Sequence, residues 1–230
     1  MRLLLTVFIA CFGTGPGVAK VPPKAATPAK PVMAPEVAKL VDRLQAFYEK
    51  TADFKAGFKQ EYTYKSFKRT QVSTGKVTFK KPALMRWEYE TPNKKTFVLS
   101  ADKVYVHDPE AMTLTKANAG TDQLSASVTF LWGQGKLADE FLITQKECAT
   151  CKGNTLLELN PLKPEPRFQK VFFEVDPKTA QVMKSTVIDP DGSENAITFS
   201  ALELNVGVAA EYFKLAPPAG TQMVDLTGAK

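Results

Sequence analysis

Residues that commonly perform catalysis are scarce in this chain. The 230 residues include one histidine, His107, and three cysteines. His107 precedes the turn pattern Asp108-Pro109. A catalytic triad or an acid–base pair needs a second side chain positioned beside the histidine, and no motif in the sequence supplies one, so we expect neither. The segment Gly133-Gln-Gly-Lys136 lacks the spacing and the Ser or Thr of a phosphate-binding loop. The sequence therefore predicts a protein that is not an enzyme and that holds neither a cofactor nor a metal.

Long apolar runs are missing as well. The run from Leu3 to Phe12 is too short to cross a bilayer. With Arg2 before it and the small residues Gly17-Val18-Ala19 after it, this run has the pattern of a signal peptide over residues 1–19, so we expect export. Cys11 leaves an alternative, because the residues before it faintly resemble a lipoprotein processing site. Cleavage there would anchor the protein itself to a membrane.

The segment after the expected signal peptide has the composition of a leader. Residues 20–35 contain five prolines among alanines and lysines. Such a composition cannot form a packed core and favours an extended, solvated chain. We therefore expect a single folded domain over residues 36–230, which is long enough to bury a core or to curl a sheet around a cavity.

Positive charge exceeds negative charge, with 30 Lys and Arg against 24 Asp and Glu. Much of the excess lies between Lys50 and Lys95, where twelve basic residues accompany four acidic ones. We interpret it mainly as the solvated outer faces of strands, although acidic partners or an anionic membrane surface would also suit it. Nucleic-acid binding would need a recognisable module, and the sequence contains none.

The hydrophobic pattern predicts one helix followed by many strands. Apolar residues recur at helical spacing from Val37 to Tyr48, which predicts an amphipathic helix that starts near Glu36. From Phe54 to Tyr64 the period changes to two, as in a strand with one solvated face. Asp191-Gly192 is a strong turn signal further along. Further strands are expected near residues 72–81, 84–90, 95–100, 103–107, 112–116, 140–145, 155–159, 168–176, 181–189, 195–205 and 211–215. This order favours a mainly β protein with helices (α+β), in which an antiparallel meander curls into a sandwich or barrel.

Two neighbouring strands carry the clearest functional signal. Strand alternation places three residues of the first strand on one face, and the same face of the next strand is apolar and aromatic. These residues are Val77, Phe79 and Lys81 on the first strand and Met85, Trp87 and Tyr89 on the second. A wide apolar surface that ends in one cation, with no catalytic group nearby, indicates a protein that holds a lipid.

Residues 122–132 interrupt the strand pattern. This segment is expected to be a short helix or irregular, and its apolar end is followed by Gly133 and Gly135. An apolar segment between flexible glycines can cover an opening, so we interpret Val128, Phe130, Leu131 and Trp132 as a lid. Lys81 would lie near it and could donate hydrogen bonds to its terminal carbonyls, which makes Lys81 a candidate latch.

Cys148 and Cys151 have the spacing of a redox motif. A thioredoxin-like site needs a βαβ context, whereas this pair lies between two expected strands. In an exported protein we favour a small disulfide that closes a loop. Thiol redox activity and metal binding remain alternatives.

Several segments of the chain, taken in order, resemble one known family. They are the early helix and then Phe54-Lys-Ala-Gly-Phe58-Lys-Gln60, Gly75-Lys-Val-Thr-Phe-Lys-Lys-Pro82, Arg86-Trp87, Asp102-Lys-Val-Tyr-Val-His-Asp108-Pro109 and Phe213-Lys-Leu215-Ala-Pro217-Pro218-Ala-Gly220. Over residues 36–227 this order resembles the periplasmic outer-membrane lipoprotein carriers, the LolA family.

The resemblance implies a fold and a function. The fold would be an incomplete antiparallel β-barrel that encloses a hydrophobic cavity and is closed by a helical lid. The function would be to take triacylated lipoproteins from an inner-membrane ABC transporter and pass them through the periplasm to an outer-membrane acceptor. The family's cavity residues would correspond to Phe54, Phe58, Met85 and Trp87, and its lid to Val128, Phe130 and Leu131. We expect the protein to act as a monomer.

The chain departs from the family at three places. Some members have an arginine before the proline of the second strand, where this chain has Lys81, and a lysine cannot make bidentate contacts. The segment with Cys148 and Cys151 and the proline-rich leader have no counterpart in the members compared. Two other functions remain open: an envelope lipid sensor or regulator with the same half-barrel, and a thiol oxidoreductase at the two cysteines.

Overall fold

The computed structural model describes residues 33–100, 102–119 and 136–228. The expected signal peptide, residues 20–32 of the leader and the expected lid segment lie outside the described residues. The signal peptide, the leader and the lid therefore stay predictions.

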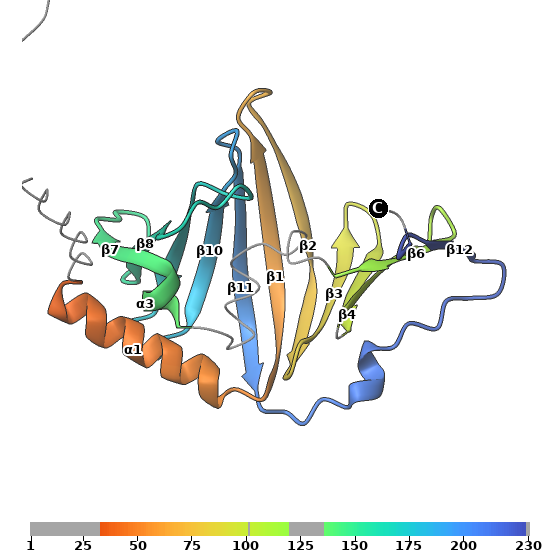
Figure 1. Ribbon diagram of the computed structural model, residues 1–230, viewed down its shortest axis with the longest axis horizontal. Helices are drawn as coiled ribbons and strands as arrows, with labels where there is room; N and C mark the ends of the chain where they lie inside the picture. Colours follow the sequence, from red (N-terminus) through yellow and green to blue (C-terminus); the bar gives the residue numbers. More distant parts are fainter. Residues whose placement is uncertain (1–32, 101, 120–135, 229–230) are drawn as a thin grey trace, which may run out of the picture. The chain divides into compact units, whose positions relative to one another are not determined.

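A twelve-stranded sheet dominates the described residues (Figure 1). Its strand order is β12-β6-β5-β4-β3-β2-β1-β11-β10-β9-β8-β7, with β12 and β7 at the two edges, so the sheet is open. Every neighbouring pair is antiparallel except β12 and β6, which run parallel. The strands are β1 (Asp53–Tyr64), β2 (Arg69–Lys80), β3 (Leu84–Thr91), β4 (Lys95–Ser100), β5 (Lys103–Asp108), β6 (Thr113–Asn118), β7 (Phe141–Lys146), β8 (Thr155–Pro161), β9 (Lys170–Val175), β10 (Val182–Ile188), β11 (Glu194–Leu204) and β12 (Gln222–Asp225). The expected mainly β, antiparallel meander is confirmed.

Helix α1 (Pro35–Lys50) begins and ends as its sequence predicts. Pro35 suits the first turn because its missing N–H would have no partner there, and Glu36 and Lys50 suit the two ends of the helix dipole. The apolar stripe of α1 joins the main core of the sheet, so α1 packs on one face of it. Arg43 fixes the helix further by donating to the carbonyl of Pro177, between β9 and β10.

We call the face that α1 packs on the inner face. The large core lies on it, and it includes residues from both halves of the sheet. Among the described residues, the outer face carries a small cluster of its own, formed by Val98, Val208 and Phe213. Alternation along each strand thus divides the sheet into a broadly apolar face and a largely polar one.

The C-terminal segment covers part of the outer face. Asp53, at the start of β1, accepts hydrogen bonds from the backbone N–H groups of Val206 and Val208 at 2.7 and 3.2 Å, which anchors the chain as it leaves β11. Arg86 of β3 lies 4.7 Å from the ring centroid of Tyr212 and donates to the Tyr212 carbonyl at 3.0 Å. These polar contacts hold the segment against the outer face and leave the inner face free of it.

Two sequence expectations near the C-terminus are wrong. Residues 211–215 were expected as a strand, but the short 3₁₀ helix η2 (Ala210–Phe213) occupies the first part of this segment and buries Phe213 against the outer face. Strand β12 was not expected, because its four residues show no clear alternation. It pairs with β6, which lies more than one hundred residues earlier in the chain.

The short helix α3 (Leu137–Glu140) lies directly before β7.

Candidate functional site

All seven residues expected to line the cavity lie on the inner face of β1, β2 and β3. The strand register places Phe54 opposite Phe79, and Phe79 opposite Met85. Val77 lies opposite Trp87. Phe58 and Tyr89 both lie opposite Gly75, on either side of it. The structure therefore brings the predicted residues together as one continuous surface.

Gly75 explains how the aromatic rings meet across three strands. Since Gly75 has no side chain, the Phe58 ring approaches the Tyr89 ring, with 5.0 Å between centroids, and the Trp87 ring, with 4.8 Å. A Cβ atom on Gly75 would lie 2.0 Å from the Glu88 carbonyl oxygen and 2.9 Å from the Phe58 ring. Glycine at this position is thus a packing requirement of the aromatic cluster.

The inner face extends beyond the predicted seven residues. Leu99 of β4 and Val104 of β5 continue the apolar row and are buried, while Phe97 and Val106 next to them are half-buried. On the other half of the sheet the row continues through Ile143, Leu157, Leu159, Val171 and Phe173. Alternation within the expected strands 95–100, 103–107 and 168–176 could have identified several of these residues.

A pocket of about 470 Å³ opens over the inner face of β1 to β5. Tyr89, Phe97 and Val106 form its apolar part, and Arg69 and Lys95 are among the polar residues that line it. Lys95 pairs with Asp108 at 3.1 Å. The pocket thus joins an apolar wall to a polar margin that includes two basic residues, which is an arrangement that an amphiphile could fill.

The Tyr89 hydroxyl is satisfied within this wall. It donates to Gln60 Oε1 at 3.1 Å, and Gln60 in turn donates to Asn195 Oδ1 at 2.8 Å. Burial raises the pKa of Tyr89 above its ordinary value, so the phenol stays neutral at physiological pH. The wall therefore gains no charge that would oppose an apolar ligand.

Lys81 contacts a helix end, but not the one expected. Its Nζ donates to the carbonyl oxygens of Tyr48 and Glu49 at 2.8 and 2.9 Å. These are C-terminal carbonyls of α1, where the negative end of the helix dipole favours a nearby cation. The Tyr48 carbonyl also accepts from the N–H of Thr51 at 3.3 Å. Lys81 therefore ties the end of β2 to α1, whereas the expected partners, the carbonyls of residues 122–132, lie outside the described residues.

The lid residues Val128, Phe130, Leu131 and Trp132 also lie outside the described residues. His107 lies on β5 opposite Thr96 and is half-buried. Within residues 33–100, 102–119 and 136–228, no group of three or more His, Cys, Asp or Glu side chains could hold a metal ion.

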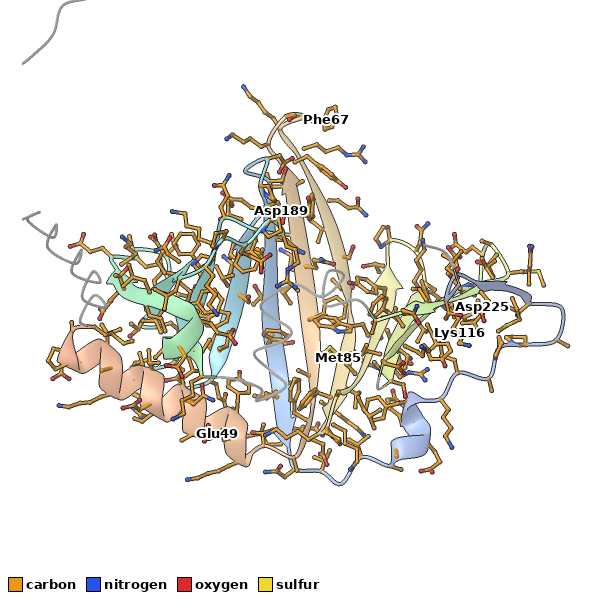
Figure 2. All side chains as sticks on the ribbon, viewed as in Figure 1. Glu49, Phe67, Met85, Lys116, Asp189 and Asp225 are labelled. Carbon is orange, nitrogen blue, oxygen red and sulfur yellow. A yellow bond between two sulfur atoms is a disulfide. The ribbon has the colours of Figure 1, made fainter. Side chains whose placement is uncertain are left out.

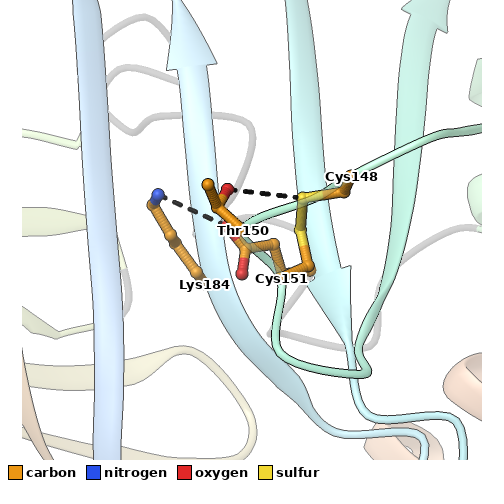
Figure 3. Close-up of a disulfide and its surroundings, with 5 residues drawn as sticks. Cys148, Thr150, Cys151 and Lys184 are labelled. Carbon is orange, nitrogen blue, oxygen red and sulfur yellow. Dashed lines mark hydrogen bonds and ion pairs between the residues drawn. A yellow bond between two sulfur atoms is a disulfide. The ribbon is translucent and has the colours of Figure 1, made fainter.

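Cys148 and Cys151 form a disulfide between β7 and β8, with 5.5 Å between their Cα atoms (Figure 3). Cys151 is buried, and Cys148 Sγ lies 3.7 Å from Thr150 Oγ1. The bond spans only three residues, so it constrains the unfolded chain little. The disulfide belongs to a turn and not to the row of inner-face residues.

Comparison with known proteins gives consistent matches. The family model described as outer membrane lipoprotein carrier protein LolA matches residues 49–216. The outer-membrane lipoprotein carrier protein of Dechloromonas aromatica is 29% identical over 184 residues, which cover 80% of this chain and 86% of that protein. The protein of the same name from Pseudomonas paraeruginosa is 27% identical over 228 residues, with 97% and 99% covered.

A solved structure supports the fold. An uncharacterized conserved protein from Thermus thermophilus superposes with a TM-score of 0.54 and 11% identity, over 82% of this chain and 98% of that one. In the part of the chain that the structure describes, no helix is both long enough and apolar enough to span a membrane.

The role of Gly75 can be tested by Gly75→Ala. Because the added methyl group would collide with backbone of β3 and with Phe58, we expect a loss of roughly 2–4 kcal/mol in the free energy of unfolding, measured with urea. Gly228→Ala is the matched control, since nothing lies within 4 Å of its Cβ position. A loss below about 0.5 kcal/mol for Gly75→Ala would show that the strands yield at this point.

Proposed function

The chain belongs to the LolA family of outer-membrane lipoprotein carriers, and from this premise we propose that it binds the acyl chains of lipoproteins released from the inner membrane and delivers them to the outer membrane. It would receive triacylated lipoproteins from an inner-membrane lipoprotein-releasing ABC transporter and pass them to an outer-membrane acceptor. After removal of residues 1–19 it would act in the periplasm as a monomer. It would act by binding and release, without catalysis.

The observation that supports this proposal best is the continuous apolar inner face of β1 to β5. Each methylene group removed from water contributes about 0.8 kcal/mol, so a long acyl chain crosses an aqueous compartment only when a protein covers it. The inner face offers buried aromatic and aliphatic side chains, and the half-buried Tyr89, Phe97 and Val106 line the pocket above them. In this proposal the curled sheet is an incomplete barrel around the acyl chains.

A cover over the inner face would complete the carrier. We assign this role to Val128, Phe130, Leu131 and Trp132, whose apolar side chains match the surface they would close. A mobile cover suits a carrier because a permanently closed cavity would not release its cargo. The proposed cavity therefore has a fixed wall on β1 to β5 and a lid that opens.

Two neighbouring residues of β5 provide a direct test. Val106 lies on the inner face and His107 on the outer face, and both are half-buried. Val106→Asp places a carboxylate against the acyl chains, which offer it no hydrogen-bond donor in place of water. We expect this variant to bind a triacylated lipopeptide at least tenfold more weakly, measured by displacement of a fluorescent lipid.

His107→Asp serves as the matched control and should bind within twofold of the parent protein. Circular dichroism of both variants checks that they are folded. If folded Val106→Asp binds the lipopeptide as tightly as the parent, the inner face of β5 does not contact cargo.

Lys81 provides a second test, of release. We propose that its bonds to the end of α1 hold the empty carrier closed at this corner, and that loading loosens them. Lys81→Leu removes both bonds and so destabilises the empty, closed form relative to the loaded form. Transfer of a lipoprotein from the loaded carrier to acceptor membranes should therefore slow several-fold. Lys81→Arg keeps a donor at this position and should transfer at close to the parent rate. Parent-like transfer by Lys81→Leu would show that Lys81 is not a latch.

A further inference from the structure

The turn between β1 and β2 exposes a large aromatic side chain. Phe67 is 79% exposed, more than any other large apolar residue in the described ranges. In Figures 1 and 2 this turn extends past the ends of the neighbouring strands, with Phe67 at its tip. Exposing a phenylalanine to water is unfavourable, and a ring at a protruding tip can reach an external surface.

Cations surround this ring. Lys65, Lys68 and Arg69 are all exposed, and residues 62–72 contain no acidic residue. Among the described residues, neither Lys68 nor Arg69 forms an ion pair. Their charges are therefore available to an external anion.

Acidic groups of the turn between β10 and β11 contact the base of the hairpin. Asp189 of this turn accepts a hydrogen bond from the Tyr62 hydroxyl at 2.6 Å and raises the pKa of Tyr62 to about 12. The N–H of Lys65 donates to Ser193 Oγ at 3.2 Å, and the carboxylate of Asp191 interacts with Lys65. These contacts partly neutralise Lys65 and brace the hairpin, while Lys68 and Arg69 remain beyond them.

A row of aromatic rings leads from the tip toward the proposed cavity. Phe67 lies 6.3 Å from Tyr64, and Tyr64 lies 4.6 Å from Tyr62, as measured between ring centroids. Tyr62 and Tyr64 alternate with the outward residues of β1 and so lie on the same face as Phe58, with Gln60 of the pocket lining between them. Arg69 at the base of the turn also lines the pocket. The tip is thus continuous with the surface that would hold acyl chains.

We propose that the β1–β2 hairpin docks the carrier on an anionic membrane surface, with Phe67 among the lipid headgroups and Lys68 and Arg69 against lipid phosphates. This inference rests on the proposed function, because a lipid carrier must approach membranes to collect or deliver cargo. A membrane suits the tip better than a protein does. A stable protein interface needs about 800 Å² on each side and a rim that excludes water from its central residues, whereas a bilayer surface accepts one protruding ring without a matching pocket.

The expected binding is weak and reversible. Each Lys or Arg near an anionic bilayer contributes about fivefold in the partition coefficient, and the inserted ring adds a comparable factor. Such a contact lets the carrier dock and leave, which a protein that moves between two membranes requires.

Vesicle flotation tests the proposal. The protein purified from the periplasm is mixed at low salt with vesicles of phosphatidylcholine and phosphatidylglycerol, or of phosphatidylcholine alone. We expect binding only to the anionic vesicles and a loss of binding as NaCl is raised. Phe67→Ser should bind at least fivefold more weakly, and the double variant Lys68→Glu/Arg69→Glu at least 20-fold more weakly.

Matched controls keep the result specific. Met223→Ser removes another exposed apolar side chain, and Lys163→Glu/Lys214→Glu changes the net charge by the same amount at exposed sites away from the hairpin. Both controls should bind anionic vesicles within twofold of the parent. If the parent does not bind these vesicles, or if the controls lose as much binding as the hairpin variants, the proposal is wrong.

Two further outcomes separate this inference from its premise. If the hairpin variants bind vesicles normally but fail to accept lipoprotein from membranes that contain the transporter, the tip docks on a protein and the membrane proposal is overturned. Binding of a triacylated lipopeptide in solution is measured in parallel. If the parent protein does not bind the lipopeptide in solution, the carrier function itself is wrong, whatever the vesicle experiment shows.

Discussion

The register between β1 and β2 is the constraint on which the rest of the structure depends. It aligns Phe54 with Phe79 and Phe58 with Gly75, and the pairing with β3 extends the same face to Met85, Trp87 and Tyr89. A slip of one residue would move the apolar set to the opposite face. Gly75 reinforces the register, because a side chain at this position would collide with β3 and with the Phe58 ring that reaches Tyr89 across β2. Both the core and the proposed cavity therefore follow from one alignment of strands.

In an open sheet, an apolar face must be shielded from water by other parts of the chain or by a ligand. Helix α1 packs on the inner face and is fixed by Arg43 at one turn and by Lys81 near its C-terminal end. The C-terminal segment covers the outer face instead, where Asp53 and Arg86 hold it. Around Tyr89, Phe97 and Val106 the inner face remains open as a pocket. In the proposed carrier, acyl chains complete the packing there, and a lid that opens keeps binding reversible.

Much of the fold could be predicted from the sequence because its signals are local. Helical spacing after Pro35 and alternation from Phe54 onward identified α1 and the strands of the meander. The same alternation placed the apolar residues of β2 on one face and those of β3 on one face, where the structure has them, and the family resemblance added Phe54 and Phe58 of β1. Non-local contacts were harder to predict. Strand β12 forms through its pairing with β6. Where a strand was expected, η2 packs Phe213 against the outer face of the sheet. The alternation also could not show that Lys81 contacts α1, since that contact depends on how the C-terminal end of the helix is placed beside the end of β2.

Native mass spectrometry of the purified protein with a triacylated lipopeptide tests the central claim most directly. If the inner face carries acyl chains, the spectrum shows a one-to-one complex with the triacylated form and none with the same peptide lacking its acyl chains. A protein that ignores both peptides, or that binds the deacylated peptide equally well, would contradict the claim that this surface recognises acyl chains.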